Sequence, residues 1–468
     1  MLALDTCRTE TDGLGSVSLD ATTPIGIQTE RARQNFPITG VSISHFPELV
    51  MALAQVKSAA ARANADLGEI SATKLQAITD VCNEICEGQH HEHFVVDVIQ
   101  GGAGTSTNMN ANEVIANLGL RKMGHDYGDY RHLHPIDDVN RSQSTNDVYP
   151  TAIRLAVLAK VEELSAALEN LQTAFGDRAN DFADIPKVGR TQLQDAVPMS
   201  LGAEFASFAV TVGEDIDRIR QVGQLMTEIN LGGTAIGTRV NAPDGYGEKA
   251  ISYLSLLSGF DLKQADNLIE ASSDLGGFVT FSGILKRVAV KLSKICNDLR
   301  LLSSGPRAGL GEIILPAVQA GSSIMPGKVN PVIPEVVNQV AYQVIGNDLT
   351  VTFAAEAGQF QLNAMEPVVA CNILESMRIL KNAVEMLTEK CVAGIKADRA
   401  RCADLLNSSL VTATLLAPYV GYDVATRVAK NARETGRTVR EIAQEMSILP
   451  DDKLNEVLAP ENALERSQ

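Results

Sequence analysis

The sequence predicts an all-α fold, and three observations support this expectation. Apolar residues recur at alternating steps of four and three in segments running from Val157 to Phe175, Phe281 to Leu302 and Ile373 to Cys391. This heptad spacing is typical of long helices that pack side by side. Trp is absent and aromatic residues make up 4%, so Leu, Ile, Val and Ala must form the core, as in helix bundles. The 45% hydrophobic content is ample for a large core.

Five long helices are expected between about residues 150 and 395. The heptad segments provide three of them, and the first should begin at Pro150, because proline suits the first turn of a helix. Two further segments, roughly 199–229 and 335–358, follow a helical pattern with broader apolar faces.

Three domains follow from this organisation. An N-terminal domain, 1–143, mixes short helical patterns with Gly- and Asn-rich loops, and a central bundle of long helices spans 144–396. A small, charged, helical C-terminal domain spans 397–468. Because one layer of five helices would leave long apolar stripes in water, we expect several subunits to pack their bundles together.

Charge and cysteine content restrict the partners and the compartment. A net charge of -17 without any basic run argues against nucleic acid and anionic membranes as partners. The seven scattered cysteines suit reduced thiols. The chain begins with neither a basic nor an apolar signal segment and contains no run of eighteen apolar residues. We therefore expect a cytoplasmic protein that is neither exported nor membrane-spanning.

Four polar stretches lie between or at the ends of the expected helices. They are GGAGTSTNMN from Gly101, NRSQSTND from Asn140, GRTQLQDAVP from Gly189 and GSSIMPGKVNP from Gly321. The first lacks the third glycine of a dinucleotide loop, and the last has Val329 where a phosphate loop needs Ser or Thr. Taken singly, each stretch is ordinary loop and cap chemistry.

Together, these stretches gather groups that suit a small dicarboxylic acid. Hydroxyl and amide donors can clamp one carboxylate, while a lysine neutralises another. The candidate residues are Thr105, Ser144, Thr145, Asn146, Thr191, Gln192, Ser322, Asn330 and the one cation, Lys328.

The histidines do not extend to the later stretches. The patch HHEH, from His90 to His93, could bind a metal, but it lacks a zinc-protease pattern and we expect a solvated turn. All seven histidines lie at or before His134, so the later loops must perform acid–base chemistry without imidazole. We assign no metal ligand.

The loop GSSIMPGKVNP resembles the signature of the fumarase and aspartase superfamily. QGGAGTSTNMNANEV, QSTND, GRTQLQDAVP and SKICNDLRLLSSGPRAGL match other segments of that family, and the likeness spans nearly the whole chain. The resemblance implies the family's three-domain fold, in which the five-helix domains of four subunits form the twenty-helix core of a homotetramer. It also implies active sites shared between three subunits.

Gln192 bears on which reaction of the superfamily to expect. GRTQLQDAVP resembles one branch of bacterial aspartases, whereas fumarases of this class, and some other aspartases, carry His in place of Gln192. Hydrating fumarate requires handling a water proton, which an imidazole paired with a carboxylate such as Glu335 can do and an amide cannot. The resemblance therefore implies an ammonia-lyase, a carbon–nitrogen lyase that reversibly converts L-aspartate to fumarate.

The same resemblance assigns roles to the candidate residues. Ser322 is the general base that removes the β-proton and leaves an aci-carboxylate, and loop amides and Lys328 stabilise its anion. The β-carboxylate is clamped by Thr105, Ser144 and Thr145, assisted by Ser323. The α-carboxylate is held by Lys328 and Asn330. The amino group is surrounded by Asn146, Thr191 and Gln192, and Glu335 is counted among the substrate-binding residues. No cofactor is required, because the β-carboxylate is the electron sink, although a divalent cation activates some family members from outside the site.

Two departures and two alternatives complete these expectations. Ile25 stands where the family commonly has Tyr, and Arg239 stands where it commonly has Gly; we expect activity to survive both. The first alternative is a class II type fumarase with a proton carrier other than Gln192. The second is a catalytically silent helical oligomer, against which the retention of Ser322, Lys328 and Asn330 argues.

Overall fold

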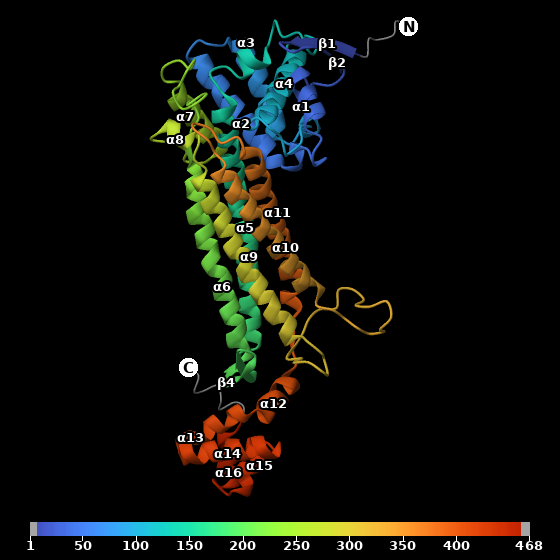
Figure 1. The fold of residues 1–468 in the computed structure, drawn as a ribbon, viewed down its shortest axis with the longest axis vertical. Coiled ribbons are helices and arrows are strands. Elements are labelled where there is room, and N and C mark those ends of the chain that lie inside the picture. The colour runs from blue at the N-terminus through green and yellow to red at the C-terminus, as the bar shows by residue number, and fades with distance from the viewer. Residues whose placement is uncertain (1–6, 460–468) are drawn as a thin grey trace. The chain divides into compact units, whose positions relative to one another are not determined.

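Helices dominate the computed structural model, which describes residues 7–459 (Figure 1). The chain divides into two compact units. Unit 1 comprises residues up to Ser165 together with Arg218–Arg287 and Gln343–Ile379, and unit 2 comprises Ala166–Asp217, Val288–Tyr342 and residues from Leu380 onward. This division follows compactness alone, so the three-domain boundaries stay a prediction.

The expected long helices are present, and each contributes one part to each unit. They are α5 Thr145–Asp181, α6 Leu201–Gly223, α9 Gly276–Leu302, α10 Val332–Glu356 and α11 Glu366–Lys390. The residues that begin and end the three predicted heptad segments are all buried; they are Val157, Phe175, Phe281, Leu302, Ile373 and Cys391. The periodicity therefore identified the faces that form the core.

The predicted start of the first long helix is wrong. α5 begins at Thr145, and Pro150 is its sixth residue. Proline has no N–H, so it leaves the carbonyl of Asn146 without its helical donor. Nδ2 of Asn230 donates to this carbonyl at 3.0 Å, which lets the helix begin one turn earlier.

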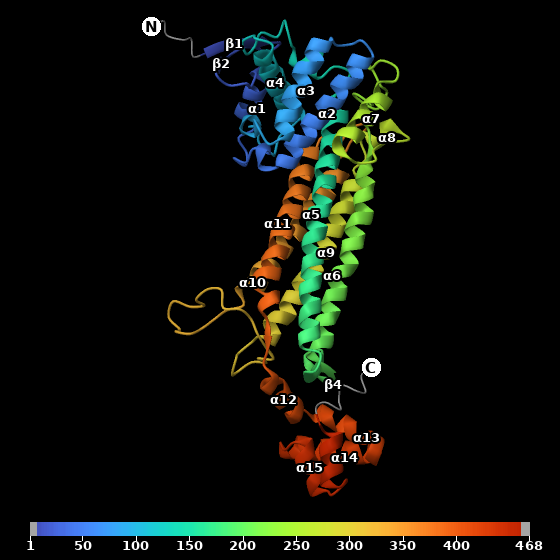
Figure 2. The ribbon, with the colours of Figure 1, turned by 180° about the vertical axis from the view of Figure 1, so that it is seen from behind.

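Unit 1 contains the shorter helices of the N-terminal region. α2 packs against α3, α4 and α7, and Figures 1 and 2 show α2, α3 and α4 side by side. The helices are α1 Ile27–Asn35, α2 Pro47–Asp66, α3 Ala72–Cys86, α4 Thr105–Lys122, α7 Tyr246–Ser258 and α8 Leu268–Ala271. Short turns are the 3-10 helices η1 Ile43–His45, η2 His91–His93 and η4 Gln224–Thr227 and the π-helix η3 Pro135–Val139. The strands form two pairs, antiparallel β1 Cys7–Asp12 with β2 Gly15–Asp20 and parallel β5 Glu228–Ile229 with β6 Lys263–Gln264.

Unit 2 contains two further strand pairs and the C-terminal helices. The pairs are β3 Pro186–Thr191 with β4 Gln194–Ser200 and β7 Ile313–Ile314 with β8 Lys396–Ala397, both antiparallel. The helices are η5 Val392–Gly394, α12 Arg399–Ser408, η6 Leu410–Thr412, α13 Ala413–Val420, α14 Tyr422–Thr435, α15 Val439–Glu445 and α16 Asp451–Val457. Residues from α13 to α16 form their own apolar cluster around Leu416, Val428 and Leu454. The segment between α9 and α10 leaves the helices as a long loop (Figures 1 and 2).

The state of the cysteines and the apolar character of the helices bear on two expectations from the sequence. The six cysteines from Cys82 to Cys402 are thiols. Within residues 7–459, no helix has both the length and the apolar character that a bilayer crossing requires.

Candidate active site

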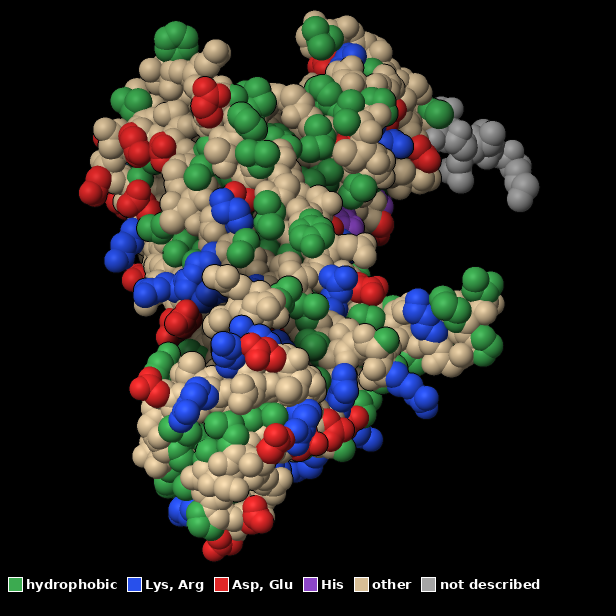
Figure 3. Space-filling model, turned by 60° about the horizontal axis from the view of Figure 1, so that its bottom comes forward, with side chains coloured by type: hydrophobic (Ala, Val, Ile, Leu, Met, Phe, Trp, Pro, Cys, Tyr) green, Lys and Arg blue, Asp and Glu red, His purple; other side chains and the backbone are tan. Residues whose placement is uncertain are grey.

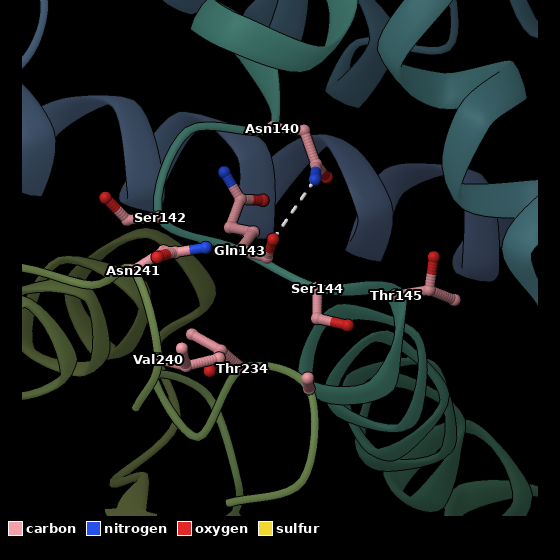
Figure 4. Close-up of a pocket in the computed structure, with 9 residues that line it drawn as sticks. Asn140, Ser142, Gln143, Ser144, Thr145, Thr234, Val240 and Asn241 are labelled. Atoms are coloured by element: carbon pink, nitrogen blue, oxygen red, sulfur yellow. Dashed lines mark hydrogen bonds between the residues drawn. The ribbon is translucent and has the colours of Figure 1, made fainter. Parts of the chain in front are cut away.

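A polar cavity of about 350 Å³ lies in unit 1 at the start of α5 (Figure 4). Its walls come from the stretch before α5 and from the loop that follows β5. The lining residues are Asn140, Ser142, Gln143, Ser144, Thr145, Thr234, Ala235, Val240 and Asn241. Ser144 and Thr145 were predicted as site residues, and the structure places both in this cavity.

Asp147 joins the two walls of the cavity. Its buried carboxylate accepts N–H bonds from Ser144 at 2.9 Å, from Gly232 at 3.0 Å and from Thr234 at 2.9 Å. Burial raises the pKa of Asp147 to about 6, although these backbone donors act in the opposite direction. Nδ2 of Asn146 adds a bond of 2.7 Å to the carbonyl of Ala235. The cavity is thus fixed by buried polar groups.

The hydroxyls of Ser144 and Thr145 are oriented by bonds that they accept. Oγ of Ser144 accepts the N–H of Asn146 at 3.2 Å, and Oγ1 of Thr145 accepts Nδ2 of Asn108 at 3.0 Å. Because each oxygen already accepts a bond, its own hydrogen remains available to donate. Such donors suit a carboxylate in the cavity.

Thr105 begins α4 after a tight glycine turn. Ala103 and Gly104 have φ values of 53° and 85°, in the left-handed region. A Cβ on Gly104 would lie 2.2 Å from Cδ1 of Tyr149, so this position requires glycine. Thr105 itself is exposed, and its hydroxyl donates to the carbonyl of Gly102 at 2.7 Å.

Ser322 lies in the long loop of unit 2, which closes on itself. The N–H of Gly321 donates to the carbonyl of Lys328 at 2.8 Å, and a Cβ on Gly321 would lie 2.5 Å from that oxygen. Nδ2 of Asn330 also donates to the carbonyl of Gly321, at 2.7 Å. Oγ of Ser322 accepts the N–H groups of Ile324 at 3.2 Å and Met325 at 3.1 Å.

The remaining residues of this stretch lie on the same segment. Ser323 and Lys328 are exposed, and Glu335 is half-buried in the first turn of α10. Figure 3 shows hydrophobic and basic side chains on the loop between α9 and α10, which projects at the right of the view. Ile324, Met325 and Val329 expose 84%, 47% and 50% of their surface, an unusual fraction for apolar side chains beside a candidate base.

Thr191 and Gln192 lie at the tip of the β3–β4 hairpin, where the sequence suggested only a loop. Thr191 pairs with Gln194, so Gln192 and Leu193 form a two-residue turn. Both turn residues have positive φ values, 54° and 60°, in a conformation that glycine or asparagine normally adopts. Both side chains are exposed.

A buried ion cluster holds the base of this hairpin, and sequence analysis missed it. Oε2 of Glu312 lies 2.9 Å from Nη1 of Arg190 and 3.3 Å from Nζ of Lys187. Lys187 also pairs with Glu204 at 2.5 Å. Because Glu312 and Lys187 are fully buried, these interactions rigidify the strand that carries Thr191.

Comparison with known proteins shows the family of this chain. Residues 15–346 match the family described as Lyase, and residues 410–464 match the family described as Fumarase C C-terminus. A relative from Pseudomonas aeruginosa named aspartate ammonia-lyase is 57% identical over 98% of this chain and 97% of its own. The chain belongs to the fumarase and aspartase family of lyases. The family expected from the sequence is thereby confirmed.

Solved structures of this lyase family have the same all-α fold. One from Brucella melitensis, described as a fumarate lyase:delta crystallin bound to cobalt, has a TM-score of 0.95 and 57% identity. The likeness covers 97% of this chain and 99% of that one. The class II fumarase of Schistosoma mansoni has a TM-score of 0.91 and 33% identity, covering 97% and 98% of the two chains. The predicted fold class is confirmed.

The two departures from the family pattern are accommodated locally in this lyase. Ile25 is a buried apolar residue, 8% exposed. Arg239 adopts φ 61°, where glycine would be unstrained, and its Nη2 donates to Oε1 of Gln264 at 3.0 Å. Its Nη1 also lies 3.8 Å from Oε1 of Glu248. The turn before the cavity residues Val240 and Asn241 therefore forms despite the long side chain.

Within residues 7–459, two groups of histidines and carboxylates have ligand atoms that all lie within 4.8 Å of one another. His90, Glu92 and His93 form one, and its ring nitrogens also meet carboxylates, with Glu84 at 3.1 Å from His90. His125, Asp129 and His132 form the other, in which the two rings stack with centroids 3.7 Å apart. The first group lies in the predicted turn around η2, where Glu92 is exposed.

Proposed function

We propose that this lyase reversibly eliminates ammonia from L-aspartate to give fumarate. Relatives that match nearly the full chain carry the name aspartate ammonia-lyase. The exposed amide of Gln192 at the hairpin tip supports the choice of an amine substrate, because an amide can bind an ammonium but cannot relay the proton of water.

The observation that carries the mechanism is the pair of backbone amides on Ser322. A serine hydroxyl is too weak an acid to ionise readily at neutral pH, so an alkoxide base needs donors placed in advance. The N–H groups of Ile324 and Met325 are such donors at 3.2 and 3.1 Å. Ser322 removes the β-proton, an aci-carboxylate forms, and ammonia then leaves from the α-carbon. Lys328 adds positive charge to the same loop.

The cavity in unit 1 supplies the β-carboxylate clamp in this mechanism. Ser144 and Thr145 donate their hydroxyl hydrogens to the carboxylate. Ser323 is a further donor, and Thr105 becomes one when its hydroxyl turns away from the carbonyl of Gly102. These bonds strengthen as negative charge builds on the carboxylate, which is the differential binding that lowers a barrier.

The other end of the substrate is bound by amides and a cation. Lys328 and Asn330 hold the α-carboxylate, while Asn146, Thr191 and Gln192 surround the amino group. Nδ2 of Asn146 already donates to the carbonyl of Ala235, and its Oδ1 is an acceptor of the kind that an ammonium requires. Glu335, in the first turn of α10, completes the set of substrate-binding residues.

We further propose a homotetramer whose active sites combine loops from three subunits. The exposed Ile324, Met325 and Val329 beside the base support this, because a loop that works on a desolvated substrate needs a cover for its apolar side chains. The reaction needs no cofactor, since the β-carboxylate accepts the electrons. Any activation by a divalent cation would come from outside the site. The six thiols from Cys82 to Cys402 support a cytoplasmic location.

The test is an ultraviolet assay for fumarate with L-aspartate and L-malate supplied separately. We expect fumarate from aspartate alone. Fumarate from malate would make the chain a fumarase with a proton carrier other than Gln192. If neither substrate gives fumarate, the result would favour a catalytically silent oligomer.

A further inference from the structure

Lys57 is a fully buried cation that contacts the cavity wall from within the protein. It lies on α2, and its side chain has no exposed surface. Nζ donates to Oδ1 of Asn108 at 2.6 Å, to Oδ1 of Asn140 at 2.8 Å and to Oε1 of Gln143 at 3.0 Å. Asn140 and Gln143 line the cavity, where Figure 4 shows both side chains.

These three contacts stabilise the charged form of the lysine. Three amide oxygens match the three N–H donors of an ammonium, whereas a neutral amine would turn a lone pair toward one of them. Fixing the oxygen of an amide also fixes its nitrogen. Nδ2 of Asn108 consequently points to Oγ1 of Thr145, and Nδ2 of Asn140 donates to the carbonyl of Gln143 at 3.2 Å.

The surroundings of Lys57 leave its charge only partly compensated. The charged and titratable groups that act on it are the carboxylate of Asp147 and the thiol of Cys82. Burial raises the pKa of the Cys82 thiol, so it stays neutral. The carboxylate of Asp147 is bound to three backbone N–H groups of the cavity walls. No carboxylate among residues 7–459 forms a direct ion pair with Lys57, so its positive potential extends into the cavity.

We propose that Lys57 is a positioning residue for the substrate β-carboxylate, which fixes Asn140 and Gln143 in the cavity wall, orients the Thr145 hydroxyl through Asn108 and supplies positive potential behind them. This inference rests on the proposed dicarboxylate substrate. Lys57 acts through Asn108, Asn140 and Gln143 and touches no reacting atom. Its loss should therefore weaken substrate binding more than it slows the chemical step.

Two variants separate this role from support of the fold. Lys57→Gln keeps two N–H donors for the amide oxygens but removes the charge. Asn108→Asp keeps the lysine, places a carboxylate against its charge and removes the Nδ2 donor to Thr145, from a position outside the cavity lining. Lys74→Met is the matched control, because it removes another lysine of unit 1, which pairs with Asp138 at 2.7 Å. The measurements are KM and kcat for L-aspartate, the dissociation constant of succinate by calorimetry, and the oligomeric state.

We expect KM and the succinate dissociation constant to rise about 10- to 100-fold in both variants, while kcat changes less than about tenfold. The control should keep the wild-type KM. Damage to the fold alone would instead lower kcat through the active fraction and leave KM unchanged, and that result would overturn the inference. Failure of the wild-type protein to turn over aspartate would overturn the proposed function itself, whereas an unchanged KM in active variants would overturn the role of Lys57 alone.

Discussion

Replacing Asn230 by alanine should destabilise this chain through the start of α5. Asn230 is 2% exposed, and its Nδ2 donates to the carbonyl of Asn146, which Pro150 leaves without a helical donor. A buried carbonyl that loses its partner costs about 1 to 3 kcal/mol. The same carbonyl belongs to a candidate substrate-binding residue, so KM for aspartate should rise as well.

The decisive comparison is the same substitution in a Pro150→Ala background. Alanine at position 150 restores the N–H that can donate to Asn146, so Asn230→Ala should then cost less than about 1 kcal/mol. The free energy of unfolding of all four proteins would be measured in urea at one protein concentration, because subunit association makes stability depend on concentration. Costs equal within about 0.5 kcal/mol in the two backgrounds would refute the reasoning. The effect would then belong to the bond between Asn230 and Ser272.

Four further predictions address the base, the turn, the hairpin and pH. Ser322→Ala should lower kcat about 100- to 10,000-fold with the oligomer intact, and near-normal fumarate formation would rule out this base. Gly104→Ala should lower stability by about 1 to 3 kcal/mol, measured as the urea midpoint, because its methyl group meets the ring of Tyr149; an unchanged midpoint would show that the ring moves freely. Glu312→Leu should cost about 3 kcal/mol in the same assay, since it leaves buried cations without this carboxylate; a stable variant would contradict that. Burial lowers the pKa of Lys57 from 10.5 to about 7, although the nearby carboxylate of Asp147 acts in the opposite direction. Between about pH 7 and pH 10.5 the unfolded state therefore binds more protons than the folded state, and the contribution of Lys57 to stability rises with pH. Lys57→Gln should lose that rise, and equal slopes in both proteins would refute it.

The helical core could be predicted because its information is local. The residues of each heptad segment lie one or two turns apart on one helix face, and burial follows that face from Val157 to Phe175 and from Phe281 to Leu302. The start of α5 could not be predicted in the same way. The penalty of Pro150 is local, but the donor that offsets it, Asn230, lies 84 residues from Asn146.

The candidate site shows the same division between local and distant information. The polar stretches identified the segments that carry Ser144 and Ser322, because hydroxyl, amide and glycine residues cluster along the chain. The β3–β4 hairpin was missed, since Gln192 and Leu193 adopt positive φ without the glycine or asparagine that usually marks such a turn. Lys57 was missed because its amide partners are 51 to 86 residues away. A lysine within the alanine-rich helix α2 was the signal available.

Rigidity is distributed unevenly between the proposed binding groups and the proposed base. The cavity walls are fixed by buried charges, Asp147 on backbone amides and Lys57 on side-chain amides. The loop with Ser322 is held instead by its own backbone, through the bond from Gly321 to Lys328, and Gly327 has a left-handed φ of 80°. A carboxylate clamp benefits from donors that do not reorganise, whereas a base must let substrate enter before it excludes water. Substitutions in the cavity wall should therefore act first on binding, and substitutions at the loop glycines should act first on turnover.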